Sequence, residues 1–252
     1  MDQLLRATAN AEGRHFWFRG FRFFVSPLLR YAASHRSSIG TSRVLDCGCG
    51  TGANLPLLNQ AGRAYGFDLS ATGLRLGRKA GRMLLARGSV AAAPFPGGVF
   101  DLVSSFDVLY SLDEATERAA IAEMFRLLKP GGFAIVNVAA MESLRGDHSV
   151  LSHEVRRYSR RDLHNRLVAA GFRIERITYT NFTLFLPMLV ARTIQRRRGL
   201  KPEIDAQYEI SVPPEPLNGV LTGLLWLESL YLRLFNAPAG SSLLCLARKP
   251  AS

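Results

Sequence analysis

Short apolar runs alternate with amphipathic stretches along most of the chain. An unbroken apolar run of about four to eight residues, bounded by turn-forming residues, is typical of a buried strand, and apolar residues at every third or fourth position are typical of a helix. Runs that are largely apolar predict strands at about 44–47, 64–67, 83–87, 100–106, 133–138, 172–179 and 242–248. Because strands and helices alternate up to about residue 180, the predicted fold class is α/β.

Polar residues mark where two of the helices should begin. Ser70 is a suitable N-cap for a helix that runs to about Gly81. Ser159 is expected to cap another helix through Ala170, with Asp162 in the first turn, where a carboxylate interacts favourably with the helix dipole. The loop before that second helix should lie at the carboxyl ends of the strands, which is the edge where open α/β sheets bind ligands.

Two apolar segments lie outside the alternation, at residues 1–40 and at about 181–240. The first packs aromatic and arginine side chains densely and is predicted to be helical. It could be ordinary core, or a lid whose His15, Trp17 and Arg19 face the cleft. The predicted domain organisation is therefore an N-terminal helical segment or lid at 1–40 and one domain at 41–252, with a helical, apolar insertion at about 181–240.

The insertion closes with a helix from about 217 to 235 that is apolar on most of its surface. Its polar residues form one narrow stripe of Asn218, Thr222, Ser229 and Arg233. So wide an apolar face must be covered by protein or lipid. The helix also contains Glu228 and is not expected to span a bilayer. Packing within the molecule, contact with anionic lipid, and dimerisation are the alternatives.

A glycine-rich turn follows the first predicted strand. Gly48, Gly50 and Gly52 occupy alternate positions, and a helical pattern starts at Ala53. Glycine permits positive φ and close approach of the backbone to a ligand. Asp46 lies just before the glycines and would repel a pyrophosphate but attract a sulfonium or an amino group. Asp68, at the end of the second strand, lies within reach of a ribose diol. An ordinary turn that binds nothing is the alternative.

At this point the sequence resembles the class I S-adenosylmethionine-dependent methyltransferases, in a bacterial subgroup of the methyltransferase type 11 kind. The resemblance is carried by residues 45–52 (Leu-Asp-Cys-Gly-Cys-Gly-Thr-Gly), by Asp68, and by residues 128–132 (Leu-Lys-Pro-Gly-Gly) before the fifth strand. It covers roughly residues 40–180. It implies a Rossmann-like doubly wound seven-stranded sheet, with strands 1–6 parallel and strand 7 antiparallel, and S-adenosylmethionine as the cofactor.

The resemblance and the loop positions together predict the site residues. Those expected at the cofactor are Asp46, Gly48, Cys49, Gly50, Gly52, Asp68, Leu69, Ser89, Val90 and Phe106. Those expected at the substrate are His15, Trp17, Arg19, Tyr110, Arg156 and Arg157, and the catalytic candidates are His153 and Tyr158. His153, Arg156, Arg157 and Tyr158 belong to one basic loop before Ser159. This basic loop could hold an anionic group of the substrate or could simply be solvated. No metal is expected.

Two positions depart from the pattern of the family. Ser89 stands where an acidic residue usually accepts the adenine amino group, so that contact should be weaker or come from the backbone. Ser111 stands where a histidine often follows the fourth strand, four residues after Asp107. Asp107 itself could be functional or could only cap a helix.

Composition limits the possible partners. The formal net charge is +12, from 32 basic and 20 acidic residues. Such a charge favours nucleic acid or an anionic membrane, although the preference for Arg beside many Ala, Gly and Leu residues also fits a GC-rich coding bias. A nucleic-acid partner is not expected, because no RNA-binding motif is appended and no Asn-Pro-Pro-Tyr tetrad follows the fourth strand. Three cysteines without paired spacing and no signal-peptide pattern predict a cytoplasmic protein, with the inner face of the membrane as an open location.

These observations predict a methyltransferase that acts by in-line displacement on a small acceptor, which could be hydrophobic or linked to a lipid. The electrophile of this reaction is already activated, so alignment in a dry site is the main requirement and no catalytic triad is expected. An RNA or protein methyltransferase is one alternative. A catalytically silent, cofactor-binding scaffold at a membrane is another, and a homodimer is open in each case.

Overall fold

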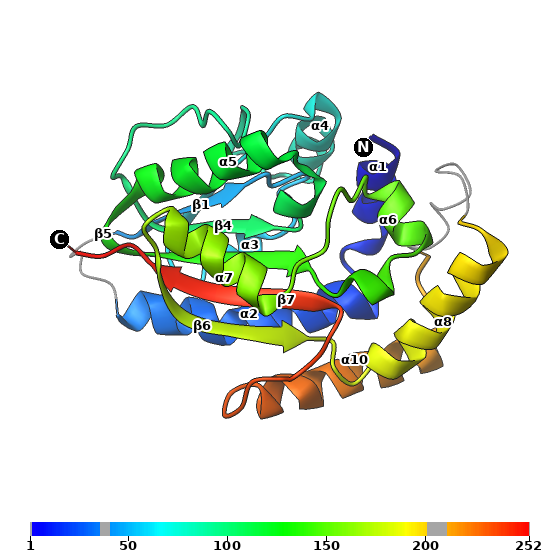
Figure 1. The fold of residues 1–252 in the computed structure, drawn as a ribbon. Helices are drawn as coiled ribbons and strands as arrows, with labels where there is room; N and C mark the ends of the chain where they lie inside the picture. Colours follow the sequence, from blue (N-terminus) through cyan, green and yellow to red (C-terminus); the bar gives the residue numbers. More distant parts are fainter. Residues whose placement is uncertain (1, 36–40, 201–210, 252) are drawn as a thin grey trace.

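The computed structural model describes residues 2–35, 41–200 and 211–251, and its strands form one seven-stranded sheet in the order β3-β2-β1-β4-β5-β7-β6 (Figure 1). The strands are β1 (Arg43–Cys47), β2 (Arg63–Asp68), β3 (Leu85–Arg87), β4 (Phe100–Phe106), β5 (Leu128–Ala139), β6 (Arg173–Thr180) and β7 (Ser242–Arg248). β1 to β5 pair in parallel, and β7 is antiparallel to both β5 and β6. The predicted fold class is confirmed.

Helices cover both faces of this sheet. They are α1 (Asp2–Ala11), α2 (Phe16–Ser34), α3 (Leu55–Leu58), α4 (Ala71–Lys79), α5 (Glu114–Leu127), α6 (Asp147–Leu151), α7 (Arg160–Ala169), α8 (Phe185–Arg198) and α10 (Glu215–Tyr231), with 3-10 turns η1 (Leu109–Ser111) and η2 (Glu142–Leu144). In Figure 1, α5 lies above the sheet, α7 crosses in front of it, and α2 and α10 lie beneath it.

The core consists of two apolar layers separated by the sheet. Successive residues of a strand point to opposite faces of the sheet. Val44 therefore joins the layer between the sheet and helices α2 and α3, while Leu45 joins the layer between the sheet and helices α5 and α7. Every residue of β4 is buried. The strand was predicted with its correct bounds although three polar residues interrupt its apolar run. Two of these have buried partners, because Asp101 accepts from the Arg43 amide and Ser104 donates to Asp46.

Most predicted boundaries lie within two residues of the observed ones. Ser70 Oγ accepts a hydrogen bond from the Gly73 amide at 3.2 Å, and Ser159 forms a reciprocal capping box with Asp162. The helix expected from Ala53 is shorter than predicted, because residues 51–54 form turns before the single turn of α3. The predicted boundary near residue 40 lies outside the described residues.

α10 differs most from the expectation, because its polar side faces the protein. Asn218 is fully buried; its side chain accepts from the Phe16 amide at 2.8 Å and donates to the Arg14 carbonyl at 3.0 Å. Ser229 is buried as well, and a Cβ on Gly20 of α2 would lie only 2.3 Å from Leu225. Packing within the molecule therefore covers Asn218 and Ser229 of the polar stripe, while Arg233 and much of the apolar face stay exposed. Of the described helices, none is long and apolar enough to cross a membrane.

Candidate cofactor and acceptor site

A cavity of about 1090 Å³ lies at the carboxyl ends of β1, β2, β4 and β5. Asp46, Asp68 and Phe106 form its floor at the strand ends. Side chains from α1, α2 and α8 form the opposite wall, so the N-terminal segment and the insertion both close the same space. Residues that lie far apart in the sequence thereby meet at the edge of the sheet where ligands of α/β folds bind.

The glycine loop is held in a conformation that other residues resist. Gly48, Gly50 and Gly52 have φ values of +78°, +56° and +73°. A Cβ on Gly48 would lie 2.5 Å from Val108, so a side chain there would displace the segment that follows β4. The amides of Gly48 and Cys49 both donate to the Phe67 carbonyl at 2.9 Å, which ties the loop to the end of β2.

Asp68 lies at the junction of the glycine loop and α4. One carboxylate oxygen accepts from the Gly50 amide at 2.8 Å, and the other accepts from the Ser70 amide at 2.8 Å. The carboxylate is therefore fixed in direction, yet each oxygen keeps lone pairs for another donor. A diol would find two acceptors side by side at this position.

Asp46 is buried beneath the loop, with only 1% of its surface exposed. Burial, reinforced by the nearby negative charge of Asp68, raises the pKa of Asp46 to about 7, against a hydrogen bond donated by Ser104 Oγ at 2.8 Å. Among the described residues no cationic side chain forms an ion pair with Asp46. A buried carboxylate of this kind is stabilised by a cationic ligand.

These features fit S-adenosylmethionine, which carries an ammonium, a sulfonium and a ribose diol. All of the predicted cofactor residues except Gly52 line the cavity. Gly52 supports the packing instead, because a Cβ there would lie 2.9 Å from Leu85 of β3. Ser89, the unusual residue of this set, accepts from the Ala91 amide at 3.2 Å and borders the cavity beside Val90.

Aromatic side chains of α2 line the far part of the cavity. His15 and Trp17 both face it, as predicted, but the wall does not include Arg19. His15 Nδ1 accepts from the Trp17 amide at 3.1 Å and so caps α2. Burial lowers the pKa of His15, which favours the neutral ring. The Phe21 ring meets Phe106 edge to face at 4.9 Å, which brings this aromatic wall against the end of β4.

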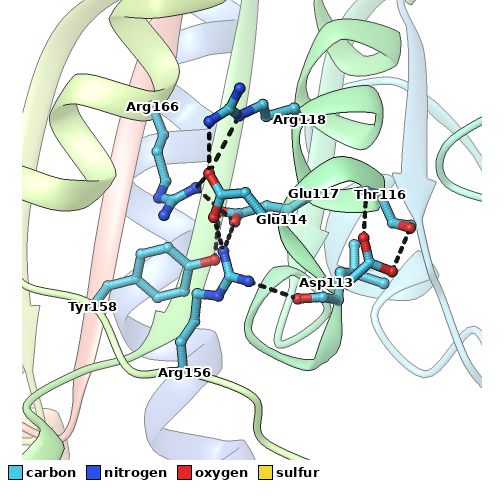
Figure 2. A network of polar contacts seen from close by, with 9 residues as sticks. Asp113, Glu114, Thr116, Glu117, Arg118, Arg156, Tyr158 and Arg166 are labelled. Atoms are coloured by element: carbon cyan, nitrogen blue, oxygen red, sulfur yellow. Dashed lines mark hydrogen bonds and ion pairs between the residues drawn. The ribbon is translucent and has the colours of Figure 1, made fainter.

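Tyr158 and Arg156 point away from the cavity into a polar network on α5 (Figure 2). The buried Tyr158 hydroxyl donates to Glu117 at 2.6 Å. The Arg156 guanidinium forms ion pairs with Glu117 and, at 2.7 Å, with Glu114, and Arg166 reaches both carboxylates at 2.8 Å. Tyr158 bridges to Ala140 as in a parallel ladder, so its side chain turns to the opposite side from that of Arg157.

The other two residues of the basic loop, His153 and Arg157, differ in whether they line the cavity. His153 is exposed and lies outside the cavity wall. Arg157 does line the cavity, but Glu154 binds it through two hydrogen bonds of 2.8 and 3.0 Å, and both side chains are buried. The ion pair neutralises the guanidinium, so this loop is poorly suited to hold an anionic group of a substrate.

Asp107 is a site residue that the sequence reasoning left undecided. It follows β4 directly, has a φ of +60°, and lines the cavity beside Tyr110 and Ser111. Its carboxylate accepts from the Asn137 side chain at 2.9 Å. Asp107 is exposed to the cavity, yet desolvation by the protein around it raises its pKa to about 7. A non-glycine residue held at positive φ often marks a functional position, but φ cannot be read from a sequence.

Glu12 was also missed as a site residue. It accepts from Thr51 of the glycine loop at 2.8 Å and forms an ion pair with Arg82 at 2.9 Å. Arg22 Nη2 donates to the Glu12 carbonyl. The N-terminal segment is thus tied directly to the loop that should hold the cofactor.

Comparison with known proteins agrees with this site. Residues 45–136 match a family model described as a methyltransferase domain. A protein of Encephalitozoon cuniculi named as a methyltransferase is 33% identical over 130 residues, which are 46% of this chain and 60% of that protein. The chain therefore spans less than two thirds of the length of this curated relative.

Solved structures show the same fold over nearly the whole chain. An S-adenosylmethionine-dependent methyltransferase of Thermotoga maritima is 18% identical, with a TM-score of 0.58, over 99% of this chain and all of that one. Phosphoethanolamine N-methyltransferase 2 of Haemonchus contortus, in complex with S-adenosylmethionine, is 17% identical, with a TM-score of 0.54, over 89% of this chain and 52% of that one.

The fold and the cavity define a doubly wound α/β protein whose glycine loop borders the cavity. Together with the methyltransferase domain matched at residues 45–136, they support a class I S-adenosylmethionine-dependent methyltransferase with S-adenosylmethionine as the cofactor.

Proposed function

We propose that the protein transfers a methyl group from S-adenosylmethionine to a hydroxyl or amino group of a small, hydrophobic acceptor. One observation carries this proposal: a single cavity joins the glycine loop and its carboxylates to an apolar, largely aromatic compartment. That compartment is lined by Phe16, Trp17, Phe18, Phe21, Leu184, Pro187, Met188 and Leu221. Such a wall binds apolar groups and keeps water away from the reacting atoms.

The carboxylates would hold the cofactor. Asp68 would accept hydrogen bonds from the ribose diol, and Asp46 would interact with the cationic end. When bound, S-adenosylmethionine supplies a methyl group whose bond to sulfur breaks as a lone pair of the acceptor forms the new bond. The role of the surrounding protein is then to orient the acceptor and to receive its proton.

Asp107 is the residue best placed to receive that proton. It lies between Phe106 and Val108, which contact Phe21 of the aromatic wall and Gly48 of the cofactor loop respectively. A pKa of about 7 suits a base that works near neutral pH. We therefore propose Asp107 in place of His153 and Tyr158, and the hydrogen bond from Asn137 would orient its carboxylate.

The hydrophobic acceptor is favoured over nucleic acid or protein by the same wall. Arg157 is neutralised by Glu154, so the basic loop offers little to a phosphate at this cavity. Acceptors of this kind are stored in membranes, and we include peripheral contact with the inner face of a membrane in the proposal. A homodimer is the second candidate for the apolar surface of the insertion.

The test uses labelled S-adenosylmethionine and a series of 4-alkylphenols of increasing chain length as surrogate acceptors. If the apolar compartment binds the chain, kcat/KM should rise by about threefold to fourfold for each added CH2 group until the compartment is full. Bulk RNA and a protein mixture serve as competing acceptors in the same assay.

Two variants assign the roles. Asp68→Ala should weaken binding of S-adenosylmethionine by about 1–3 kcal/mol, measured by calorimetry. Asp107→Asn should lower kcat by about a hundredfold or more and leave that affinity unchanged. Label in RNA, or no dependence on chain length, would overturn the hydrophobic acceptor. Tight cofactor binding without transfer to any acceptor would favour the silent scaffold.

A further inference from the structure

The exposed side of α10 is an apolar stripe. Leu217, Val220, Leu224, Leu227, Tyr231 and Leu234 follow one another at alternating spacings of three and four residues, so they lie along one side of the helix and its C-terminal turn. All six are exposed, from 38% for Leu224 to 80% for Leu234. We call these six residues the α10 face.

No charge interrupts this surface. Between Glu215 and Arg233 the sequence contains one charged residue, Glu228. Glu228 is buried and accepts hydrogen bonds from the Phe182 and Thr183 amides at 2.9 and 3.0 Å, which also fastens the segment before α8 to α10. The α10 face is therefore apolar over the whole helix, and the polar groups of the helix are turned inward.

α8 presents a second apolar surface beside the cavity. Leu184, Pro187, Met188 and Ala191 line the cavity, whereas Leu186, Val190 and Ile194 are exposed on another side of the helix. None of the α8 residues is fully buried. In Figure 1, α8 rises from the region of α10 at the rim of the molecule. One helix thus separates the proposed acceptor compartment from the surroundings, with apolar side chains on both sides.

Cations stand at the ends of these surfaces. Arg197 and Arg198 end α8, in line with its exposed apolar residues, and Arg233 follows the end of α10; all three are exposed. Arginine side chains next to an apolar surface can reach the head groups while the apolar residues enter the lipid. Each such cation strengthens the attraction to an anionic surface.

We propose that the α10 face and the outer side of α8 dock on an anionic lipid surface. A second copy of the chain could also cover a stripe with this spacing, because it resembles the seam of a helix pair. The exposed area is wider than such a seam, however. Trp226 is 47% exposed and lies about 100° around the helix from Leu227, so one partner helix would leave it uncovered. A helix half sunk in lipid covers both.

Docking at lipid would place α8 between the bilayer and the apolar compartment. One consequence of docking rests on the proposed function. A hydrophobic acceptor could then reach the cavity past Leu186 and Met188 without crossing water. The docking itself requires neither cofactor nor acceptor, so it can be tested without either.

The first experiment is cosedimentation of the whole protein with phosphatidylcholine vesicles that contain or lack phosphatidylglycerol. The protein should sediment with the anionic vesicles, less with the neutral ones, and less at high salt. Leu224→Glu together with Leu227→Glu should lower the partition coefficient by at least about tenfold, because two apolar side chains leave the lipid. Both positions are exposed, so the variant should keep its fold, to be checked by circular dichroism.

Val168→Glu is the matched control. Val168 is an exposed apolar residue of α7, on the opposite face of the sheet, and its replacement should leave vesicle binding unchanged. The affinity of each variant for S-adenosylmethionine is measured in parallel. Loss of vesicle binding with retained cofactor affinity separates docking from the proposed function.

Trp226 supplies a local readout, since the chain contains only two tryptophans. In a Trp17→Phe background, Trp226 emission should shift to the blue on addition of anionic vesicles and should be quenched by brominated lipid. Protein that stays in the supernatant, or Trp226 that lipid does not quench, would overturn the proposal. So would a dimer in sedimentation equilibrium without lipid that the double Glu variant dissociates, because the α10 face would then bind a second copy.

Discussion

Asp46 shows how one residue prepares a cofactor site at a cost to the free protein. The carboxylate is buried at the end of a central strand, and it accepts a hydrogen bond from the neutral hydroxyl of Ser104. Its pKa of about 7 means that near neutral pH the ionised form is only partly populated before a cation arrives. A cationic ligand favours the ionised form, so binding should lower this pKa and release a proton.

The affinity for S-adenosylmethionine should therefore increase as the pH rises towards and through 7. For one group with a pKa of about 7, the change from pH 6 to pH 7.5 is about fivefold to tenfold. Calorimetry in buffers of different ionisation enthalpy would measure both the affinity and the released proton. Asp46→Asn should bind more weakly at pH 7.5 and lose this dependence, and the comparison with wild type cancels the titration of the ligand itself. An unchanged profile in Asp46→Asn would assign the titration to another group.

At the scale of elements, the network on α5 joins helices and loop from three parts of the chain (Figure 2). Glu117 is buried and accepts from Tyr158, Arg156 and Arg166, so α5, α7 and the loop after β5 share one carboxylate. A buried carboxylate with cationic partners fixes geometry, and removal of the carboxylate leaves uncompensated charge. The basic loop that the sequence offered as a substrate site therefore supports the structure in large part.

Tyr158→Phe should lower the free energy of unfolding by about 0.5–1.5 kcal/mol, since one buried hydrogen bond is lost. Glu117→Gln should lower it by about 3 kcal/mol or more, because Arg156 and Arg166 lose a charged partner. Urea unfolding measures both changes. Methyl transfer by the folded Tyr158→Phe variant should stay within about twofold of wild type. A variant of normal stability that no longer transfers methyl groups would restore Tyr158 as a catalytic residue.

At the scale of the whole molecule, the N-terminal helices line the same cavity as the glycine loop. Leu5 and Thr8 of α1 line the cavity, and Glu12 connects the segment to Thr51 and Arg82. The cofactor would then lie beneath α1, and the exchange of cofactor would require this segment to move. The lid at the N-terminus stays a prediction, which the following experiment tests.

Hydrogen exchange in residues 2–14 should slow when S-adenosylmethionine is added, because the bound cofactor holds the segment closed. Glu12→Gln should speed dissociation of the cofactor by about tenfold, through loss of a buried charged contact worth about 1.5 kcal/mol or more. Stopped-flow fluorescence gives the rate. Glu175→Gln, at the sheet edge far from the cavity, is the control, since its ion pair with Arg173 is exposed. Equal exchange with and without cofactor would refute the lid.

The sequence by itself determined the order of strands and helices along the chain. It also determined the glycine loop and the two carboxylates beside it. Local signals suffice there: largely apolar runs mark the buried strands, Ser70 and Ser159 cap their helices, and a glycine loop between two carboxylates has a short-range pattern. These features depend on residues within about twenty positions of one another.

Only the tertiary structure decided the acceptor end and the orientation of α10. Whether a side chain faces a cavity depends on which distant segments pack beside it: Tyr158 turns to Glu117, Arg157 is neutralised by Glu154, and Asp107 is set at the end of β4 in a left-handed conformation. α10 has a narrow polar stripe in its sequence, and that pattern favoured burial of the apolar side. Asn218 and Glu228 reverse the expected orientation, because they satisfy backbone groups of α2 and of the segment before α8 that would otherwise be buried without partners.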